Sequence, residues 1–330
     1  MDEKELKEII YKSKETFNVK WEEVAGQEKA IEVLKKYIIN PVKFPKQSES
    51  KQNPLIKCIL LYGPPGVGKT YLVKAAATEI QKNFFTIFPP IIMSKWFAQS
   101  KQDRIIKNLF DYAKKNKPSV IHLDEIDFMT NTNNLNDNMN NTTRIIKQEF
   151  LKQINELSND DGVIVLGVAA KPWELDPAVR KCFQKKIYIT LPELNVRKIL
   201  FELYLKNISH NLTNEQIDYL AKNTELFSYS DIYSLLQDAY YGPYRKCLSA
   251  EYFKKVKGIN GLEWNYTPCE QNEPGAIKMK MEEITNPKEI LPPLVNFDDF
   301  KKALEKAKPS INIEDLKKYE KFKEEFSQKE

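Results

Sequence analysis

Short apolar runs alternate with longer amphipathic segments along the first part of the chain. Five runs are rich in apolar residues, several of them nearly continuous: 56–62, 83–88, 119–124, 162–170 and 185–191. Strands that are buried on both faces have this character, and helices between successive strands favour a parallel arrangement. The pattern therefore predicts an α/β fold with a parallel five-stranded sheet covered by helices.

After residue 192 the spacing of apolar positions becomes helical. Segments 195–207, 214–224 and 230–242 each carry an apolar stripe at helical spacing. The helical pattern is interrupted over about residues 251–292. Within this segment, residues 276–281 alternate apolar and lysine side chains, as in an antiparallel strand with one solvent-exposed face. The second part of the chain is thus predicted to be a helical small domain with a β insertion.

These patterns predict the domain boundaries. We expect an N-terminal helical arm at 1–19, a large nucleotide-binding domain at 20–192 and a small domain at 193–330, with its β insertion at 251–292 and a C-terminal helix at 312–327. Within the arm, residues 4–16 are predicted to form a short charged helix. The asparagine-rich segment 130–143 is predicted to be a mobile loop, because asparagine side chains compete for backbone hydrogen bonds.

Composition excludes several classes of protein. Hydrophobic residues make up 42% and charged residues 29% of the 330 positions, which is typical of a globular protein. The 51 basic and 46 acidic side chains are finely mixed, so no nucleic-acid partner is expected. The amino terminus carries acids where a secretory signal has apolar residues, and no run approaches the roughly 18 apolar residues of a membrane span, which predicts a cytoplasmic protein. The four cysteines lack metal-ligand spacing.

The strongest local motif is GPPGVGKT at residues 63–70, between a predicted strand and a predicted helix. In such a loop the backbone N–H groups and the helix N-terminus hold phosphates, a lysine neutralises the outer phosphates, and a hydroxyl binds Mg²⁺. Three of the ten glycines of the chain fall in this loop. The motif predicts an ATP site that comprises Gly63, Pro64, Pro65, Gly66, Val67, Gly68, Lys69, Thr70 and Tyr71.

Two acids follow the predicted strand 119–124. Asp124 ends the strand and Glu125 comes directly after it. An acid at the tip of a neighbouring strand reaches the magnesium shell, and a second acid beside it polarises the attacking water. We therefore expect Thr70 and Asp124 to bind Mg²⁺, and Lys69, Asp124 and Glu125 to carry the catalysis of ATP hydrolysis.

Further motifs extend this picture beyond the phosphate site. WEEVAGQEKA, SKWFAQS, KPWELDPAVRK and KKIYITLPE, with GPPGVGKT and VIHLDEID, resemble the AAA ATPases of the meiotic group, which includes katanin, spastin, fidgetin and the relatives of vacuolar protein sorting-associated protein 4. The segments YTPCEQNEPGAIKM, ILPPLVNFDDFKKAL and KPSINIEDLKKYEKFKEEF are most similar to the last of these. The resemblance covers roughly residues 17–328.

The resemblance implies a ring, a hexamer of self or paralogue subunits that disassembles ESCRT filament proteins in endosomal sorting. It implies that Val24, Ala25 and Gly26 lie against the adenine, and that Lys95, Trp96 and Phe97 form a pore loop that grips the substrate chain. It also implies a cofactor protein at the β insertion, and contact with the endosomal membrane that is only indirect and peripheral.

Three positions depart from the family's pattern. The family has an asparagine that orients the attacking water where this chain has Ala170, and two arginine fingers where it has Lys181 and Cys182. Lysine lacks the planar fork of arginine, and an arginine finger is worth about 10³–10⁵ in turnover. The cations that flank Cys182 also allow a reactive thiol, but no histidine or second cysteine lies near it in sequence.

These departures leave more than one function open. The first is an ATPase whose intrinsic hydrolysis is slow or is completed by a partner paralogue, and the retained Glu125 favours it. The alternative is a nucleotide-binding pseudo-ATPase that acts as a scaffold or regulator of an active paralogue ring, which Ala170, Lys181 and Cys182 favour. Severing of a filament or microtubule, by analogy with katanin, is a third and weaker possibility.

Overall fold

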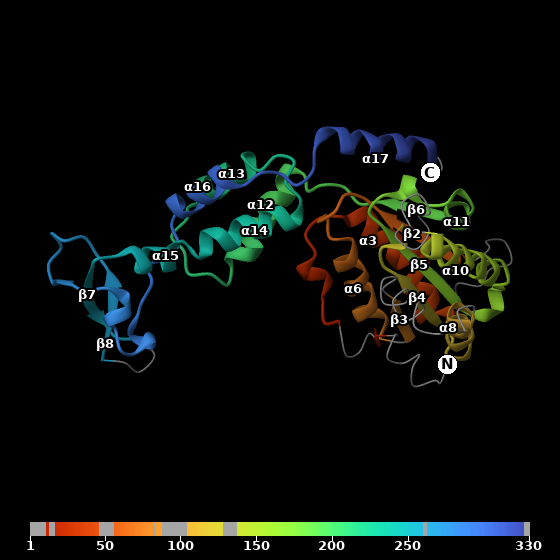
Figure 1. The fold of residues 1–330 in the computed structure, drawn as a ribbon, viewed down its shortest axis with the longest axis horizontal. Helices are drawn as coiled ribbons and strands as arrows, with labels where there is room; N and C mark the ends of the chain where they lie inside the picture. Colours follow the sequence, from red (N-terminus) through yellow and green to blue (C-terminus); the bar gives the residue numbers. More distant parts are fainter. Residues whose placement is uncertain are drawn as a thin grey trace. The chain divides into compact units, whose positions relative to one another are not determined.

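The structure, a computed structural model, describes residues 11–12, 17–45, 56–81, 83–87, 104–127, 137–259 and 263–326. It divides into two compact units (Figure 1): residues 1–191 together with 311–330, and residues 192–310. The C-terminal helix, which the sequence patterns assigned to the small domain, thus groups with the first unit. The reason is its apolar face, since Tyr319 and Phe322 are buried in the core of that unit.

The first unit is built on a six-stranded sheet with the order β1-β3-β4-β5-β2-β6. The strands are β1 (Tyr11–Lys12), β2 (Cys58–Tyr62), β3 (Asn83–Ile87), β4 (Ser119–Leu123), β5 (Val163–Ala169) and β6 (Lys185–Tyr188). The five strands from β2 to β6 are parallel to their neighbours. This confirms the predicted parallel five-stranded sheet.

The edge strand β1 corrects the helix that was predicted over residues 4–16. Tyr11 and Lys12 pair antiparallel with β3, opposite Thr86 and Phe85. The outer edge of β3 offers unpaired backbone groups, and pairing with them satisfies the two residues better than a charged helix without a core contact. The rest of the predicted helix lies outside the described residues.

The helices of the first unit follow the expected alternation with strands. They are α3 (Glu28–Leu34), α4 (Asn40–Lys43), α6 (Lys69–Ile80), α8 (Arg104–Lys115), α10 (Asp137–Asn155), α11 (Pro177–Cys182) and α17 (Ile313–Phe326). A π-helical turn, η2 (Lys35–Ile39), joins α3 to α4. The backbone of 137–143 belongs to α10, so the predicted loop was wrong there: a long amphipathic helix continues through asparagines, whose helix propensity is only slightly unfavourable.

The core of the first unit includes strand β2, which lies between β5 and β6 and whose five residues are all buried. Tyr62 stacks on Tyr188 of β6, with ring centroids 5.3 Å apart, and meets Phe322 of α17 edge to face at 5.0 Å. A helix that closes the chain is therefore packed against the strand that leads into the phosphate-binding motif. This contact fixes the position of α17 within the unit.

The second unit consists of helices and a small antiparallel sheet. The helices are α12 (Leu194–Leu205), α13 (Asn214–Lys222), α14 (Tyr229–Tyr240), α15 (Gly242–Ser249) and α16 (Phe297–Lys306), and the strands are β7 (Tyr252–Lys257), β8 (Trp264–Pro268) and β9 (Ala276–Lys278). The sheet has the order β8-β7-β9. Of the strand predicted over residues 276–281, Ala276–Lys278 form β9, which pairs antiparallel with β7. The prediction was wrong at its end, because Met281 begins a turn of 3-10 helix, η5 (Met281–Glu283).

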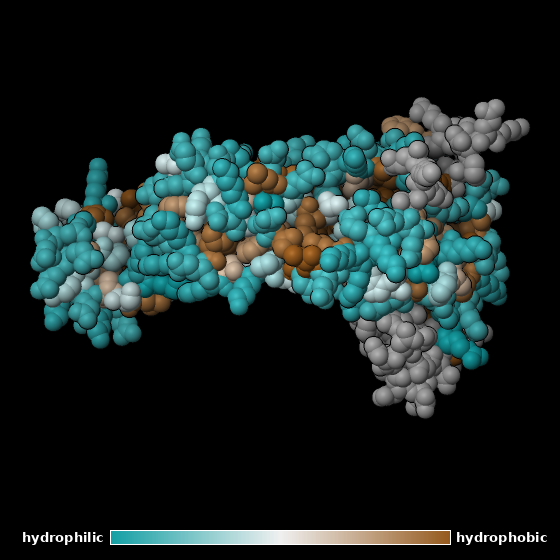
Figure 2. Space-filling view, turned by 90° about the horizontal axis from the view of Figure 1, so that it is seen from above, coloured by the Kyte–Doolittle hydropathy of each residue, from teal (hydrophilic) through white to brown (hydrophobic). Residues whose placement is uncertain are grey.

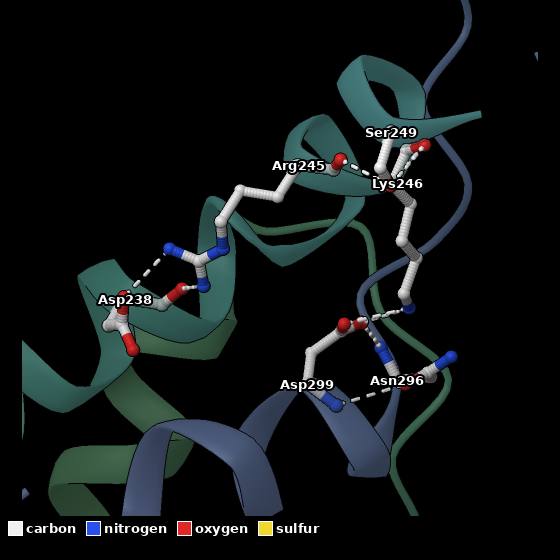
Figure 3. A network of polar contacts seen from close by, with 6 residues as sticks. All are labelled: Asp238, Arg245, Lys246, Ser249, Asn296 and Asp299. Carbon is white, nitrogen blue, oxygen red and sulfur yellow. Dashed lines mark hydrogen bonds and ion pairs between the residues drawn. The ribbon is translucent and has the colours of Figure 1, made fainter. Parts of the chain in front are cut away.

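A polar network fixes α15 between its two neighbouring helices (Figure 3). Asp299 of α16 is 3% exposed, and its carboxylate lies 2.7 Å from the ammonium of Lys246 on α15. The same carboxylate accepts a hydrogen bond from the Asn296 backbone N–H at 3.1 Å. On the other side, Arg245 pairs with Asp238 of α14 at 2.8 Å. Because β7 begins directly after α15, the network also anchors the β insertion.

The face of the chain that Figure 2 shows is mainly polar. Figure 2 shows hydrophilic residues over most of one face, with smaller hydrophobic areas between them. Among the helices that the structure describes, none combines the length and the apolar character needed to cross a bilayer.

One histidine in the sheet predicts a measurable pH dependence of stability. His122 of β4 is 1% exposed, and burial lowers its pKa from 6.5 to about 3. The unfolded chain therefore binds a proton below pH 6.5 that the folded chain does not, so the free energy of unfolding falls as the pH drops from 6.5 towards 3. One proton corresponds to about 1.4 kcal/mol per pH unit.

His122→Leu should remove this contribution. We measure the free energy of unfolding of both proteins by urea titration. The value for the variant minus the value for the wild type should rise steadily as the pH falls from 7 to 5. The difference should be constant above pH 7, where the imidazole is neutral in both states. A difference that does not change with pH would contradict the buried neutral histidine.

Candidate active site

The loop between β2 and α6 is shaped by glycines. A Cβ at Gly63 would lie 2.2 Å from the carbonyl oxygen of Ile189, so only glycine allows this approach of the two backbones. Gly66 and Gly68 have φ values of 75° and 83°, in the left-handed region that other residues rarely adopt. The sequence therefore folds residues 63–68 into a tight turn that places α6 directly after the loop.

Lys69, the first residue of α6, points back to the loop. Its Nζ donates to the carbonyl oxygens of Gly63 at 2.8 Å and of Pro64 at 2.7 Å. The side chain is buried, and burial lowers its pKa to about 8. The negative charges of Asp127, Asp124 and Glu125 act in the other direction and raise the pKa, but their effect is smaller. A buried ammonium among loop carbonyls forms a site for an anionic group.

Thr70 and Asp124 lie together although 54 residues separate them. The Thr70 hydroxyl donates to Oδ2 of Asp124 at 3.1 Å. Asp124 follows β4 and is 6% exposed; burial raises its pKa, and the hydrogen bond from Thr70 and the charge of Lys69 act in the opposite direction. A hydroxyl and a carboxylate at this distance are hard oxygen ligands of the kind that Mg²⁺ prefers.

Glu125 adopts an unusual backbone conformation. Its φ is 51°, in the left-handed region, and its N–H donates to Oδ1 of Asp124 at 3.2 Å. Its side chain is exposed. A glutamate held in a costly conformation directly after a buried acid is typical of a functional position. The turn presents the carboxylate of Glu125 to solvent while Asp124 stays with Thr70.

The segment Val24–Gly26 lies next to the start of α6. A turn of 3-10 helix, η1 (Trp21–Glu23), precedes it, and Tyr71 donates a 3.4 Å hydrogen bond from its hydroxyl to Glu23. Gly26 has a φ of 69°, and Ala25 is buried. The contact between Tyr71 and Glu23 brings the segment expected at the adenine alongside the phosphate loop.

Sequence reasoning missed Asp127. Its Oδ2 accepts hydrogen bonds from the N–H of Ala170 at 3.1 Å and of Lys171 at 2.8 Å, so it ties the end of β4 to the loop after β5. Ala170 therefore lies close to the acids of the site, but its methyl group offers no polar contact. The signal in the sequence was the last letter of DEID, an acid three residues after Asp124.

Lys181 and Cys182 end α11. Lys181 is exposed, whereas Cys182 is half-buried, packs against the core, and donates from Sγ to the carbonyl of Ala178 at 3.3 Å. Burial raises the pKa of Cys182. The thiol is therefore held in its protonated form, and the geometry does not support the reactive thiol that its cationic neighbours suggested. Lys95, Trp96 and Phe97 lie outside the described residues.

The residues present fit a nucleotide with Mg²⁺. The glycine-shaped loop, the buried ammonium of Lys69 and the oxygen pair of Thr70 and Asp124 match what a triphosphate and its metal require. Lys69 and the loop 63–68 would hold the phosphates, and Thr70 and Asp124 would hold the metal.

Two family models match the chain. Residues 59–191 match the ATPase family associated with various cellular activities (AAA). Residues 266–326 match the Vps4 C terminal oligomerisation domain. The first match contains the phosphate loop and both acids, and the second contains the end of β8 and all of β9, α16 and α17.

Solved structures with a similar fold include the FIGL-1 AAA domain in complex with ADP. It has a TM-score of 0.75 and 27% sequence identity, and the comparison covers 99% of this chain and 98% of that one. A structure that describes katanin self-assembly has a TM-score of 0.69 at the same identity, over 97% of this chain and 95% of that one.

Curated relatives are more similar in sequence. Vacuolar protein sorting-associated protein 4A of Rattus norvegicus is 41% identical over 319 residues, which are 94% of this chain and 72% of the relative. Vacuolar protein sorting-associated protein 4 of Dictyostelium discoideum is 40% identical over 94% of this chain and 70% of its own. The chain therefore belongs to the AAA ATPases, and within them to the family of vacuolar protein sorting-associated protein 4.

Proposed function

We propose that the chain works in a ring that uses ATP hydrolysis to remove subunits from ESCRT filaments in endosomal sorting. The contact between Thr70 and Asp124 beside the buried Lys69 is the observation that carries the ATPase part of this proposal. Membership of the family and the match to an oligomerisation domain support the ring. The proposed setting is the cytoplasm, with peripheral recruitment to endosomes through the substrate.

The residues of the site divide the work of hydrolysis. Lys69 binds the outer phosphates and the N–H groups of residues 66–70 surround them. Bound Mg²⁺ would supply charge neutralisation at the phosphates, with Thr70 and Asp124 as its protein ligands. Glu125 accepts the proton of the attacking water, and its exposed position leaves room for that water. Val24, Ala25 and Gly26 form the adenine side of the site.

A filament release assay tests the proposal. We expect the protein, alone or mixed with an active paralogue, to move ESCRT filament subunits from the pellet to the supernatant in sedimentation with ATP and Mg²⁺, and not without ATP. Phosphate release is measured in parallel. Phosphate release without filament release would reject the substrate, and neither activity in any mixture would favour the pseudo-ATPase alternative, which no comparison supports.

The family's finger positions give a separate prediction. If Lys181 and Cys182 limit turnover, the double variant Lys181→Arg with Cys182→Arg should raise phosphate release, because arginine binds phosphate with two hydrogen bonds where lysine offers a point charge. The upper bound is about 10³–10⁵-fold, the full worth of an arginine finger. A matched control is Lys114→Arg with Lys115→Arg at the end of α8, which should change nothing. No gain in the finger variant would mean that these positions do not limit hydrolysis.

A further inference from the structure

Gln27 lies beside the candidate site, but none of the roles assigned so far uses it. It is the N-cap of α3 and directly follows Gly26, the last residue of the segment 24–26. Its φ is 65° and that of Gly26 is 69°, so two successive residues are left-handed. This conformation is costly for a residue with a side chain, and such residues are concentrated at functional sites.

Helix capping does not account for this glutamine. The side chain of Gln27 makes no capping hydrogen bond to α3, and glutamine is not among the residues that favour an N-cap. Its Nε2 instead donates to the carbonyl oxygen of Thr190 at 2.9 Å, 163 residues further along the chain. The side chain therefore ties the end of the segment 24–26 to the backbone that follows β6.

The backbone after β6 lies against the start of the phosphate loop. Ile189, which precedes Thr190, is fully buried, and its N–H donates at 2.8 Å to the carbonyl oxygen of Tyr62, the last residue of β2. The carbonyl oxygen of Ile189 is the atom that leaves no room for a Cβ at Gly63. The acceptor of the Gln27 hydrogen bond is therefore one residue from the first glycine of the loop, on a backbone that the core holds in place.

The other end of the segment 24–26 is tied to the far side of the loop. Glu23 accepts the 3.4 Å hydrogen bond from the hydroxyl of Tyr71, in the first turn of α6. Between the two contacts, Ala25 is buried. The two hydrogen bonds thus join the segment to both ends of the phosphate loop, and they set how far the segment lies from it.

We propose that Gln27 is a positioning residue for the nucleotide. Its hydrogen bond to Thr190, with the contact at the other end, holds the segment 24–26 at the distance from the phosphate loop that a nucleoside triphosphate spans. The inference rests on the proposed function, which puts the base at this segment and the phosphates in the loop. Contacts that are already in place when the ligand arrives add to affinity, because binding then does not have to order them.

A ligand without a base separates this role from a general structural role. The affinities of ATP and of inorganic triphosphate are measured by titration calorimetry with Mg²⁺, and their ratio gives the contribution of the nucleoside. Gln27→Leu keeps the approximate size of the side chain and removes the donor. Gln81→Leu is the matched control, because Gln81 is also a glutamine in the left-handed region, with a φ of 52°, at the opposite end of α6.

We expect Gln27→Leu to lower ATP affinity by about twofold to tenfold, the contribution of one hydrogen bond, and to leave triphosphate affinity near that of the wild type. In phosphate release, KM for ATP should rise while kcat stays near wild type, because the loop still holds the reacting phosphate. Gln81→Leu should keep the wild-type ratio of affinities. Thermal midpoints show whether both variants are folded.

Other results overturn the inference. A wild-type ratio in Gln27→Leu would remove Gln27 from nucleotide binding, and an equal loss of both ligands would show a structural role only. The same fall of the ratio in Gln81→Leu would also count against it. A wild-type protein that binds triphosphate as tightly as ATP has no base contact to position, which overturns the inference and leaves the phosphate site. A wild-type protein that binds neither ligand overturns the proposed function as well.

Discussion

Replacement of Lys69 by alanine should abolish nucleotide binding. The ammonium is buried at the start of α6, on the carbonyl oxygens of Gly63 and Pro64. A charge-assisted hydrogen bond contributes about 1.5–3 kcal/mol, and Lys69 would make at least one such bond to the phosphates. Loss of one such bond lowers ATP affinity, measured by titration calorimetry with Mg²⁺, by roughly 10–150-fold, and each further bond that is lost adds to this.

The control is Lys114→Ala on α8. It removes a lysine that pairs with Asp161, just before the start of β5, and not with the phosphate loop. It should keep wild-type affinity. Thermal melts of both variants show whether the fold is intact, since loss of Lys69 leaves two loop carbonyls without their donor. Normal ATP affinity in a folded Lys69→Ala protein would refute the placement of the nucleotide.

The same lysine predicts how binding depends on pH. Its pKa in the free protein is lowered to about 8 by burial, and phosphate oxygens favour the protonated form. Above about pH 8 the free protein must take up a proton to bind ATP, so the affinity falls by up to tenfold per pH unit as the pH rises. Below pH 7 Lys69 is fully protonated in the free protein, so its contribution to the affinity is complete and no longer changes with pH.

The sheet of the first unit could be predicted from the sequence because each strand carries its own signal. A strand buried on both faces, such as Cys58–Tyr62, is a continuous apolar run in the sequence. Its parallel partner β5 is also a continuous run of apolar and small residues. The phosphate loop is equally local, since three glycines, a lysine and a threonine within eight residues define it. The proximity of Thr70 and Asp124 was predicted from the two motifs, although the strands that carry them are not direct neighbours, since β5 lies between β2 and β4.

Other features depend on contacts that no local pattern carries. Strand β1 depends on its pairing with the edge of β3, and two residues such as Tyr11 and Lys12 are too short a segment to predict it. The grouping of α17 with the first unit depends on Tyr319 and Phe322 finding Tyr62 and Tyr188, more than 130 residues away in sequence. An apolar helix face predicts burial but does not name its partner.

Asp127 shows the same limit within the site. In the sequence it is one acid beside two others, and the motif assigns chemistry only to the first pair. Its contacts appear only in the fold, where Oδ2 accepts from the amides of Ala170 and Lys171, 43 and 44 residues further along the chain in the loop after β5. Sequence departures such as Ala170 therefore cannot be judged alone, because the contacts of that position appear only in the folded chain.

Glu125→Gln should stop hydrolysis while it leaves binding intact. Glutamine keeps the size of the side chain but cannot accept a proton, and general-base catalysis is worth about 10²–10⁴-fold in rate. The hydrogen bond from the backbone N–H of residue 125 to Asp124 remains, so the contact between Asp124 and Thr70 is preserved. We expect phosphate release to fall by that factor, with ATP affinity near wild type.

This variant separates the ATPase from the pseudo-ATPase directly. A working ATPase loses turnover with Glu125→Gln, whereas a protein that only binds nucleotide has no turnover for the substitution to remove. Glu174→Gln, which exchanges a glutamate on η4 (Pro172–Glu174) that pairs with Lys171, is the matched control and should keep wild-type rates. Equal phosphate release from wild type and Glu125→Gln, alone and mixed with a paralogue, would mean that the measured hydrolysis does not arise at this site. A costly left-handed backbone at Glu125 would then lack the functional reason that accounts for it.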